Sequence, residues 1–65
     1  LRDKIEFYAL MAADGEGIPL LIASATRDLD RFADEMAIRQ QYGLHVPAHA
    51  ADLVQTLRQR ITSWG

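Results

Sequence analysis

The sequence predicts a small two-layer α+β fold, in which a β-hairpin is followed by two α-helices that cover it. Three observations predict this order of elements: apolar residues alternate between residues 4 and 12, an Asp-Gly turn follows, and apolar residues recur at helical spacing from Leu29 onward. The 65 residues form a single domain, residues 1–65. A domain of about this size buries only about 60% of the surface that its unfolded chain exposes, so the expected core is thin.

The first strand is expected between residues 4 and 12, where the sequence shows the two-residue period of a strand. One face of this strand would carry Ile5, Phe7, Ala9 and Met11. Tyr8 and Leu10 make the second face partly apolar as well. Asp14 and Gly15 then predict a hairpin turn, because Asp-Gly readily adopts the positive φ angles of tight turns.

The second strand is expected from residue 18 to about residue 24. Ile18, Leu20 and Ile22 would face one side, with Pro19 and Leu21 on the other. Since proline cannot donate to a sheet ladder, its place is an edge position or the start of the strand. The resulting hairpin has two open edges and an apolar second face, and it gains stability only by packing on other elements.

A helix is expected next, because a set of apolar residues falls at helical spacing: Leu29, Phe32, Ala33 and Met36. Thr26 or Asp28 is suited to cap its start. Gly43 is placed to end it as the left-handed residue after the C-cap, with Leu44 as the accompanying hydrophobic contact. The acidic and basic residues of this segment, such as Glu35 and Arg39 four apart, indicate a solvated face with weak ion pairs.

A second helix is expected to open at Pro47, which suits a helix first turn. One stripe along this helix is apolar and consists of Ala50, Leu53, Val54, Leu57, Ile61 and Trp64. Arg58 and Arg60 lie near its end, where they favour the negative pole of the helix dipole.

Composition excludes several classes of function. The chain has no cysteine, which removes disulfide, zinc-thiolate and thiol-nucleophile chemistry. No apolar stretch approaches the roughly 20 residues that span a bilayer, so we expect a soluble protein with no membrane partner, and the cytoplasm is the default location. The net charge of -2 disfavours non-specific attraction to nucleic acid.

No catalytic, cofactor or metal site is expected. His45 and His49 are four apart, but Pro47 lies between them and no third ligand is nearby. The acidic residues are better explained by a solvated helix face than by a catalytic pair. Gly15 and Gly17 lack the third glycine and the following helix of a dinucleotide fingerprint. The sequence therefore predicts that the chain is not an enzyme and needs no cofactor.

The expected function is a non-catalytic protein-interaction or oligomerisation module of a larger protein. The first residue is Leu1 rather than Met, which favours a fragment of a longer polypeptide. The second face of the expected hairpin needs a cover, which would come from a second copy in a homodimer or from the rest of the parent polypeptide. The expected interface residues are Tyr8, Leu10, Leu21 and Trp64.

A junction of Tyr42, Gly43 and Leu44, followed by Val46 and Pro47 at the opening of an amphipathic helix, completes a pattern that begins with the expected hairpin. This pattern resembles the small N-terminal module of a domain-of-unknown-function family in plasmid and phage replicative helicases and primases. The resemblance implies an alternative function as a nucleic-acid-binding accessory domain of a mobile-element replication protein. A looser likeness is to small antitoxins with a hairpin packed on a helix, which implies a regulator as a further alternative.

Overall fold

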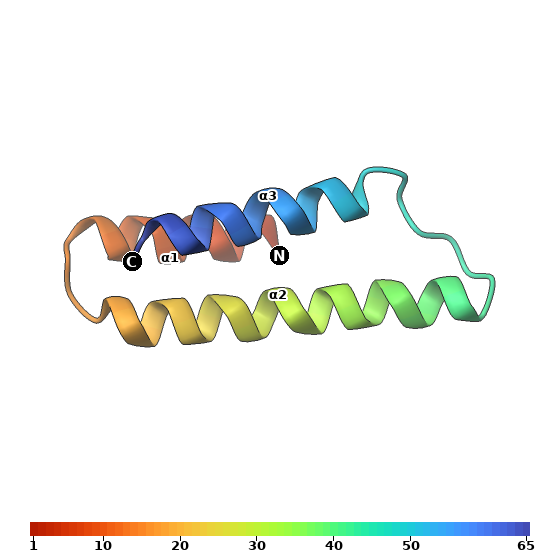
Figure 1. Cartoon of the computed structure of the whole chain (residues 1–65), viewed down its shortest axis with the longest axis horizontal. Coiled ribbons are helices and arrows are strands. Elements are labelled where there is room, and N and C mark those ends of the chain that lie inside the picture. The colour runs from red at the N-terminus through yellow and green to blue at the C-terminus, as the bar shows by residue number, and fades with distance from the viewer.

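The computed structural model describes all 65 residues and consists of three α-helices. They are α1 (Arg2–Ala13), α2 (Ile18–Gln41) and α3 (Ala50–Ser63). Both α1 and α3 run antiparallel to α2 (Figure 1). The molecule is elongated, with extents of 42 × 17 × 16 Å, because α2 is twice as long as α1 and extends beyond it.

The predicted α+β fold is wrong, because the chain has no strand and no β-hairpin. The segment expected as the first strand is α1, and the segment expected as the second is the start of α2. In a helix the apolar residues of α1 divide between two sides: Ile5 is fully buried, whereas Phe7 and Leu10 are mostly exposed. A short helix with apolar residues on two sides produces nearly the same sequence pattern as a strand.

The sequence correctly predicted a tight turn after residue 13, but it assigned this turn to a β-hairpin, whereas it connects α1 to α2. Gly15 and Gly17 both have positive φ, at 78° and 65°, as the sequence predicted for a tight turn, but the turn joins two helices. Pro19 lies in the first turn of α2, where its missing N–H would have had no helical partner. The Leu21 N–H donates to the Gly17 carbonyl at 2.9 Å as the helix starts.

The predicted end of α2 is confirmed. Gly43 has a φ of 70°, its N–H donates to the Gln40 carbonyl at 3.1 Å, and the Leu44 N–H donates to the Arg39 carbonyl at 2.8 Å. These two bonds define a Schellman motif, the common way to end a helix with a left-handed glycine. The helix begins at Ile18, however, and not near Thr26 or Asp28 as the sequence suggested.

The apolar stripe of the last helix is also confirmed. Ala50, Leu57 and Ile61 are buried, and the other members of the stripe, Leu53, Val54 and Trp64, are partly buried. The helix begins at Ala50 rather than at Pro47. Pro47 instead accepts a hydrogen bond from the Ala50 N–H at 3.0 Å, which forms a single turn before the helix.

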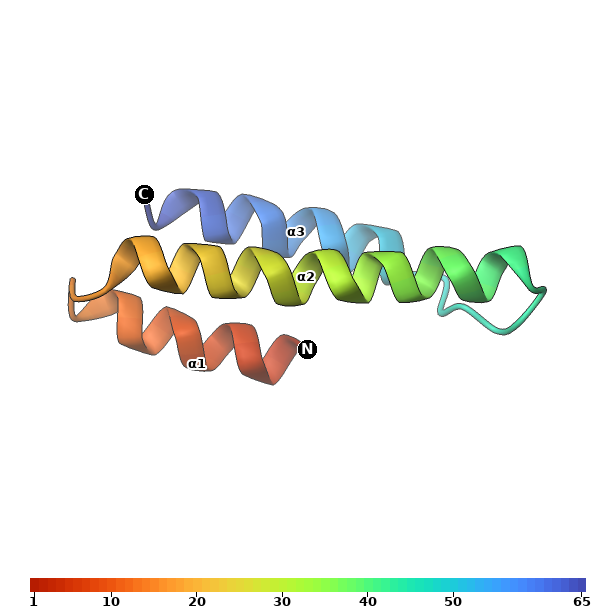
Figure 2. The same ribbon diagram turned by 90° about the horizontal axis from the view of Figure 1, so that it is seen from below.

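One small core joins all three helices. It consists of Ile5 from α1, Ala25 and Leu29 from α2, and Leu57 and Ile61 from α3. Only seven of the 65 residues are buried, so the expectation of a thin core is met. These residues place the core in the half of the molecule where α1 packs beside α2. Figures 1 and 2 show α1 lying along the first half of α2.

Candidate protein-interaction site

The structure leaves an apolar groove between the second half of α2 and the beginning of α3. Its volume is about 300 Å³, and seven of its eight lining residues are hydrophobic. From α2 it is lined by Ala33, Met36, Ala37 and Gln40. The opposite wall is formed by Val46, Ala50, Ala51 and Val54. We call this feature the α2–α3 groove.

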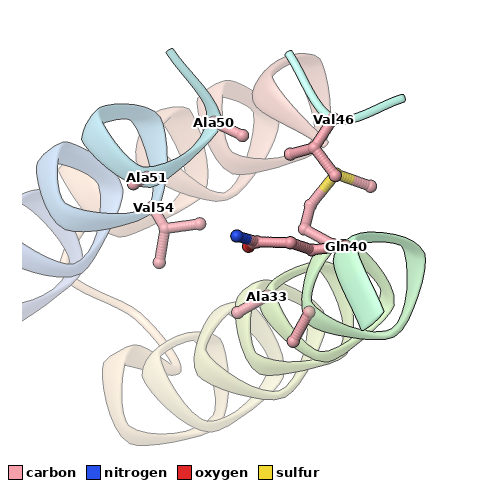
Figure 3. A pocket seen from close by; sticks show the side chains of 8 residues that line it. Ala33, Gln40, Val46, Ala50, Ala51 and Val54 are labelled. Atoms are coloured by element: carbon pink, nitrogen blue, oxygen red, sulfur yellow. The ribbon is translucent and has the colours of Figure 1, made fainter. Parts of the chain in front are cut away.

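The groove exists because of helix length and side-chain size. α1 has 12 residues and α2 has 24, so the second half of α2 has only α3 and the connection of residues 42–49 beside it (Figure 2). Four of the lining residues are alanines, which leave space between the two helix backbones unfilled. The only polar lining residue is Gln40, whose amide end extends across the groove toward α3 (Figure 3).

A second apolar surface lies on α1. Phe7, Leu10 and Met11 are 60%, 72% and 45% exposed, and their spacing of three and four places them on one side of the helix. This side is turned away from the core, which α1 contacts through Ile5 and Tyr8. We call these three residues the α1 outer stripe. The α1 outer stripe and the α2–α3 groove are thus two apolar features that the packing of the three helices does not cover.

The four residues expected to form an interface do not share one exposed face. Leu10 is exposed and belongs to the α1 outer stripe, but Leu21 is only 6% exposed and lies inside the chain. Tyr8 and Trp64 are partly buried and pack against the core. The hairpin face on which this grouping depended does not exist, and of the four only Leu10 is mostly exposed.

Ion pairs connect the helices to one another. Lys4 of α1 pairs with Asp28 of α2 at 3.2 Å, and Arg58 of α3 pairs with Asp30 of α2 at 2.7 Å. Glu6 of α1 forms a bidentate pair with Arg60 of α3. The intrahelical pairs expected along α2, such as Glu35 with Arg39, are not among them.

Arg39 explains one of the missing intrahelical pairs. Its Nε donates to the His45 carbonyl at 2.8 Å, so this guanidinium holds the connection after α2 instead of pairing with Glu35. This bond holds the backbone of His45, and the next residue, Val46, lines the groove.

Asp28 is the most enclosed of the charged groups, with a side chain that is 14% exposed. Partial burial raises the pKa of its carboxyl, but hydrogen bonds from Lys4 and from the Tyr8 hydroxyl, the latter at 3.1 Å, outweigh this and hold the pKa below its ordinary value. The hydrogen bonds from Arg60 lower the pKa of Glu6, and the same contact raises the pKa of Arg60. The ion pairs of Lys4 with Asp28 and of Glu6 with Arg60 hold α1 against α2 and α3.

The residues considered for metal binding or catalysis are dispersed. No group of three or more histidine, cysteine, aspartate or glutamate side chains is placed to hold a metal ion. The side chains of His45 and His49 are exposed. Asp28 and Asp30 are engaged in the interhelical ion pairs described above.

Sequence reasoning missed the α2–α3 groove, although a signal was present. Ala33 and Ala37 are four apart on α2, and Ala50 and Ala51 open α3. Small residues at facing positions of two helices leave unfilled space only where the backbones stay at an ordinary packing distance. To predict the groove, one must also know that α1 does not extend along the second half of α2. The expected hairpin gave no such information, because it contained no α1.

The chain matches no family model, no curated protein sequence and no solved structure. None of its three helices is long and apolar enough to cross a membrane.

Proposed function

We propose that this chain is a non-catalytic protein-interaction module whose α2–α3 groove receives apolar side chains from a helix of its partner. The observation that carries the proposal is the groove itself: about 300 Å³, lined almost wholly by apolar side chains and open at the end of the molecule that α1 does not reach. Laying the apolar face of a helix into such a groove is a recurrent mode of protein recognition.

The charges favour a protein partner over nucleic acid. Three of the seven basic residues, Lys4, Arg58 and Arg60, are paired with carboxylates of neighbouring helices. Arg39 is bonded to a backbone carbonyl. Four of the seven basic side chains are thus engaged within the chain and the net charge is -2, so we favour a protein partner over nucleic acid. The resemblances to replicative helicase modules and to antitoxins both included a hairpin that the chain lacks, so neither contributes to this proposal.

Site-specific photocrosslinking tests the proposal. A photoreactive amino acid replaces Ala37 in the groove, and in a matched variant it replaces Ala23, which is exposed on α2 but lies outside the groove. Each variant is expressed in the native cell, irradiated, and its adducts identified by mass spectrometry. We expect one dominant adduct from position 37 and none from position 23. Equal labelling from both positions, or no adduct from position 37, would refute the proposal.

A further inference from the structure

We infer that α1 is a releasable lid, which opens from α2 and α3 as one unit while those two helices stay paired with each other. The lid covers the apolar side chains at the centre of the core, where Ile5 packs with Ala25, Leu29, Leu57 and Ile61. The inference goes beyond the proposed function and does not depend on what occupies the α2–α3 groove. It follows from a difference between the contacts that hold α1 and those that join α2 to α3.

The apolar attachment of α1 is small. Ile5 is the only buried residue of this helix, and Tyr8 adds a partly buried side chain beside the core. The other large apolar side chains of α1, those of the α1 outer stripe, are turned away from α2 and α3. A segment with few buried apolar contacts opens at a lower free energy than the whole domain unfolds.

Polar contacts supply the rest of the attachment, and one carboxylate carries most of it. Oδ2 of Asp28 lies 3.2 Å from Nζ of Lys4 and accepts a hydrogen bond from the Tyr8 hydroxyl at 3.1 Å. The other tie, between Glu6 and Arg60, joins side chains that are 48% and 41% exposed. Exposed ion pairs contribute little to stability, because water solvates both charges when the pair separates. Asp28 is therefore the main polar anchor of the lid.

The pairing of α2 with α3 does not require α1. Ala50, Leu57 and Ile61 are buried on α3. The connection between the two helices is closed by the left-handed turn at Gly43 and by the hydrogen bond from Arg39 to the His45 carbonyl. This connection lies at the end of the molecule that α1 does not reach (Figure 2). It is therefore unchanged when the lid opens.

The connection between α1 and α2 is suited to act as a hinge. Gly15 and Gly17 both have positive φ, and a Cβ built on either would meet no heavy atom within 4 Å, so this segment is not packed against its neighbours. Released α1 would also lose its helix. It has 12 residues and no side-chain hydrogen bond at its N-cap, and isolated helices of this length are marginal in water. Opening is thus expected to expose the backbone amides of α1 together.

Amide hydrogen exchange, measured residue by residue by NMR at low urea concentrations, tests this inference. We expect the amides of α1 to be protected at least about tenfold less than the slowest amides of α2 and α3. Their protection should also fall less steeply with urea, because release of the lid exposes less surface than unfolding of the whole chain.

Two variants distinguish release of the lid from unfolding of the whole chain. Asp28→Asn weakens contacts that exist only while α1 is docked, so it should speed exchange in all three helices by the same factor, about five- to thirtyfold. Gly43→Ala strains a turn that stays intact when α1 opens. It should speed the slowest amides of α2 and α3 about fivefold and leave those of α1 within about twofold of the wild type.

Three results would overturn the inference. If the α1 amides have the protection and the urea dependence of the slowest amides, all three helices unfold together and α1 is not a separate lid. If Gly43→Ala speeds exchange in α1 as much as in α2 and α3, the conclusion is the same. If Asp28→Asn leaves exchange in α1 unchanged, Asp28 is not the anchor. The urea dependence of the wild type decides the question even if a variant fails to fold.

Discussion

Replacing Gly43 by alanine tests the geometry that ends α2 and aims the chain toward the groove. Gly43 has a φ of 70°, and two hydrogen bonds, from its own N–H and from that of Leu44, close the Schellman motif. A left-handed conformation brings Cβ close to the following carbonyl in any residue other than glycine. The substitution therefore strains the backbone at the one residue where α2 gives way to the connection.

The magnitude follows from two opposing effects. A Cβ built on Gly43 would have no other heavy atom within 4 Å, so the surroundings add no clash and only the backbone strain of about 1–2 kcal/mol applies. Alanine also restricts the unfolded chain, which returns about 0.4–1 kcal/mol. We expect a net loss of about 1 kcal/mol in the free energy of unfolding, which lowers the melting temperature of a domain this small by about 4–8 °C.

Thermal unfolding followed by circular dichroism at one fixed protein concentration measures the effect, since any self-association would make the midpoint depend on concentration. Gly65→Ala is the control: this residue lacks a positive φ, and its Cβ would lie at an ordinary contact distance of 3.5 Å from Cδ1 of Ile22. Its free energy of unfolding should stay within about 0.5 kcal/mol of the wild-type value. Gly43→Asn should lose less than Gly43→Ala, because asparagine tolerates the left-handed region. A Gly43→Ala midpoint equal to or above that of the wild type would refute the reasoning.

Three further predictions concern the core, the partly buried carboxylate of Asp28 and nucleic acid. Leu29→Ala removes a fully buried side chain and should cost about 3 kcal/mol in urea unfolding; a loss below about 1 kcal/mol would mean that Leu29 is not at the centre of the core. Asp28→Asn should cost about 1–2 kcal/mol at neutral pH, because the hydrogen bonds from Lys4 and Tyr8 lose their charged acceptor. Since the pKa of Asp28 is lowered in the folded state, its stabilisation is present above the unfolded pKa and is lost as the pH falls through the folded one. The difference between wild type and Asp28→Asn should therefore shrink below about pH 4, and a difference independent of pH would contradict this assignment. The chain should show no measurable anisotropy change with a labelled DNA duplex at physiological salt, whereas micromolar binding that weakens steeply with salt would favour the nucleic-acid alternative.

Most of the second half of the chain was predictable from sequence because its two main signals, the helix end at Gly43 and the apolar stripe of α3, each have one structural meaning. Gly43 follows the last residue of a helical pattern and precedes a leucine, a combination that few structures other than a helix end produce. The stripe from Ala50 to Trp64 is apolar on one side only, so its period of 3.6 is unmistakable. The start of this helix was misplaced by three residues, since Pro47 suits the turn before a helix as well as its first turn.

The first half was not predictable by the same means because its signals are ambiguous. Asp14 and Gly15 favour a tight turn but do not specify whether strands or helices flank it. Pro19 fits the start of a strand and the first turn of a helix equally well. The α2–α3 groove could not be located, because it depends on where α1 ends relative to α2, and that is a property of the tertiary arrangement.

The cause of the strand prediction bears on the function. The alternation that suggested a strand placed Ile5, Phe7 and Met11 on one face, but in α1 Ile5 points into the core while Phe7 and Met11 remain exposed. The alternation arises because α1 carries a second apolar side in addition to the one its own fold uses. A helix that is apolar on more than one side is expected to be covered on each of them. The chain covers only the side of Ile5, so the alternation in the sequence and the exposed apolar surface of α1 have the same cause, the outward-facing residues Phe7 and Met11.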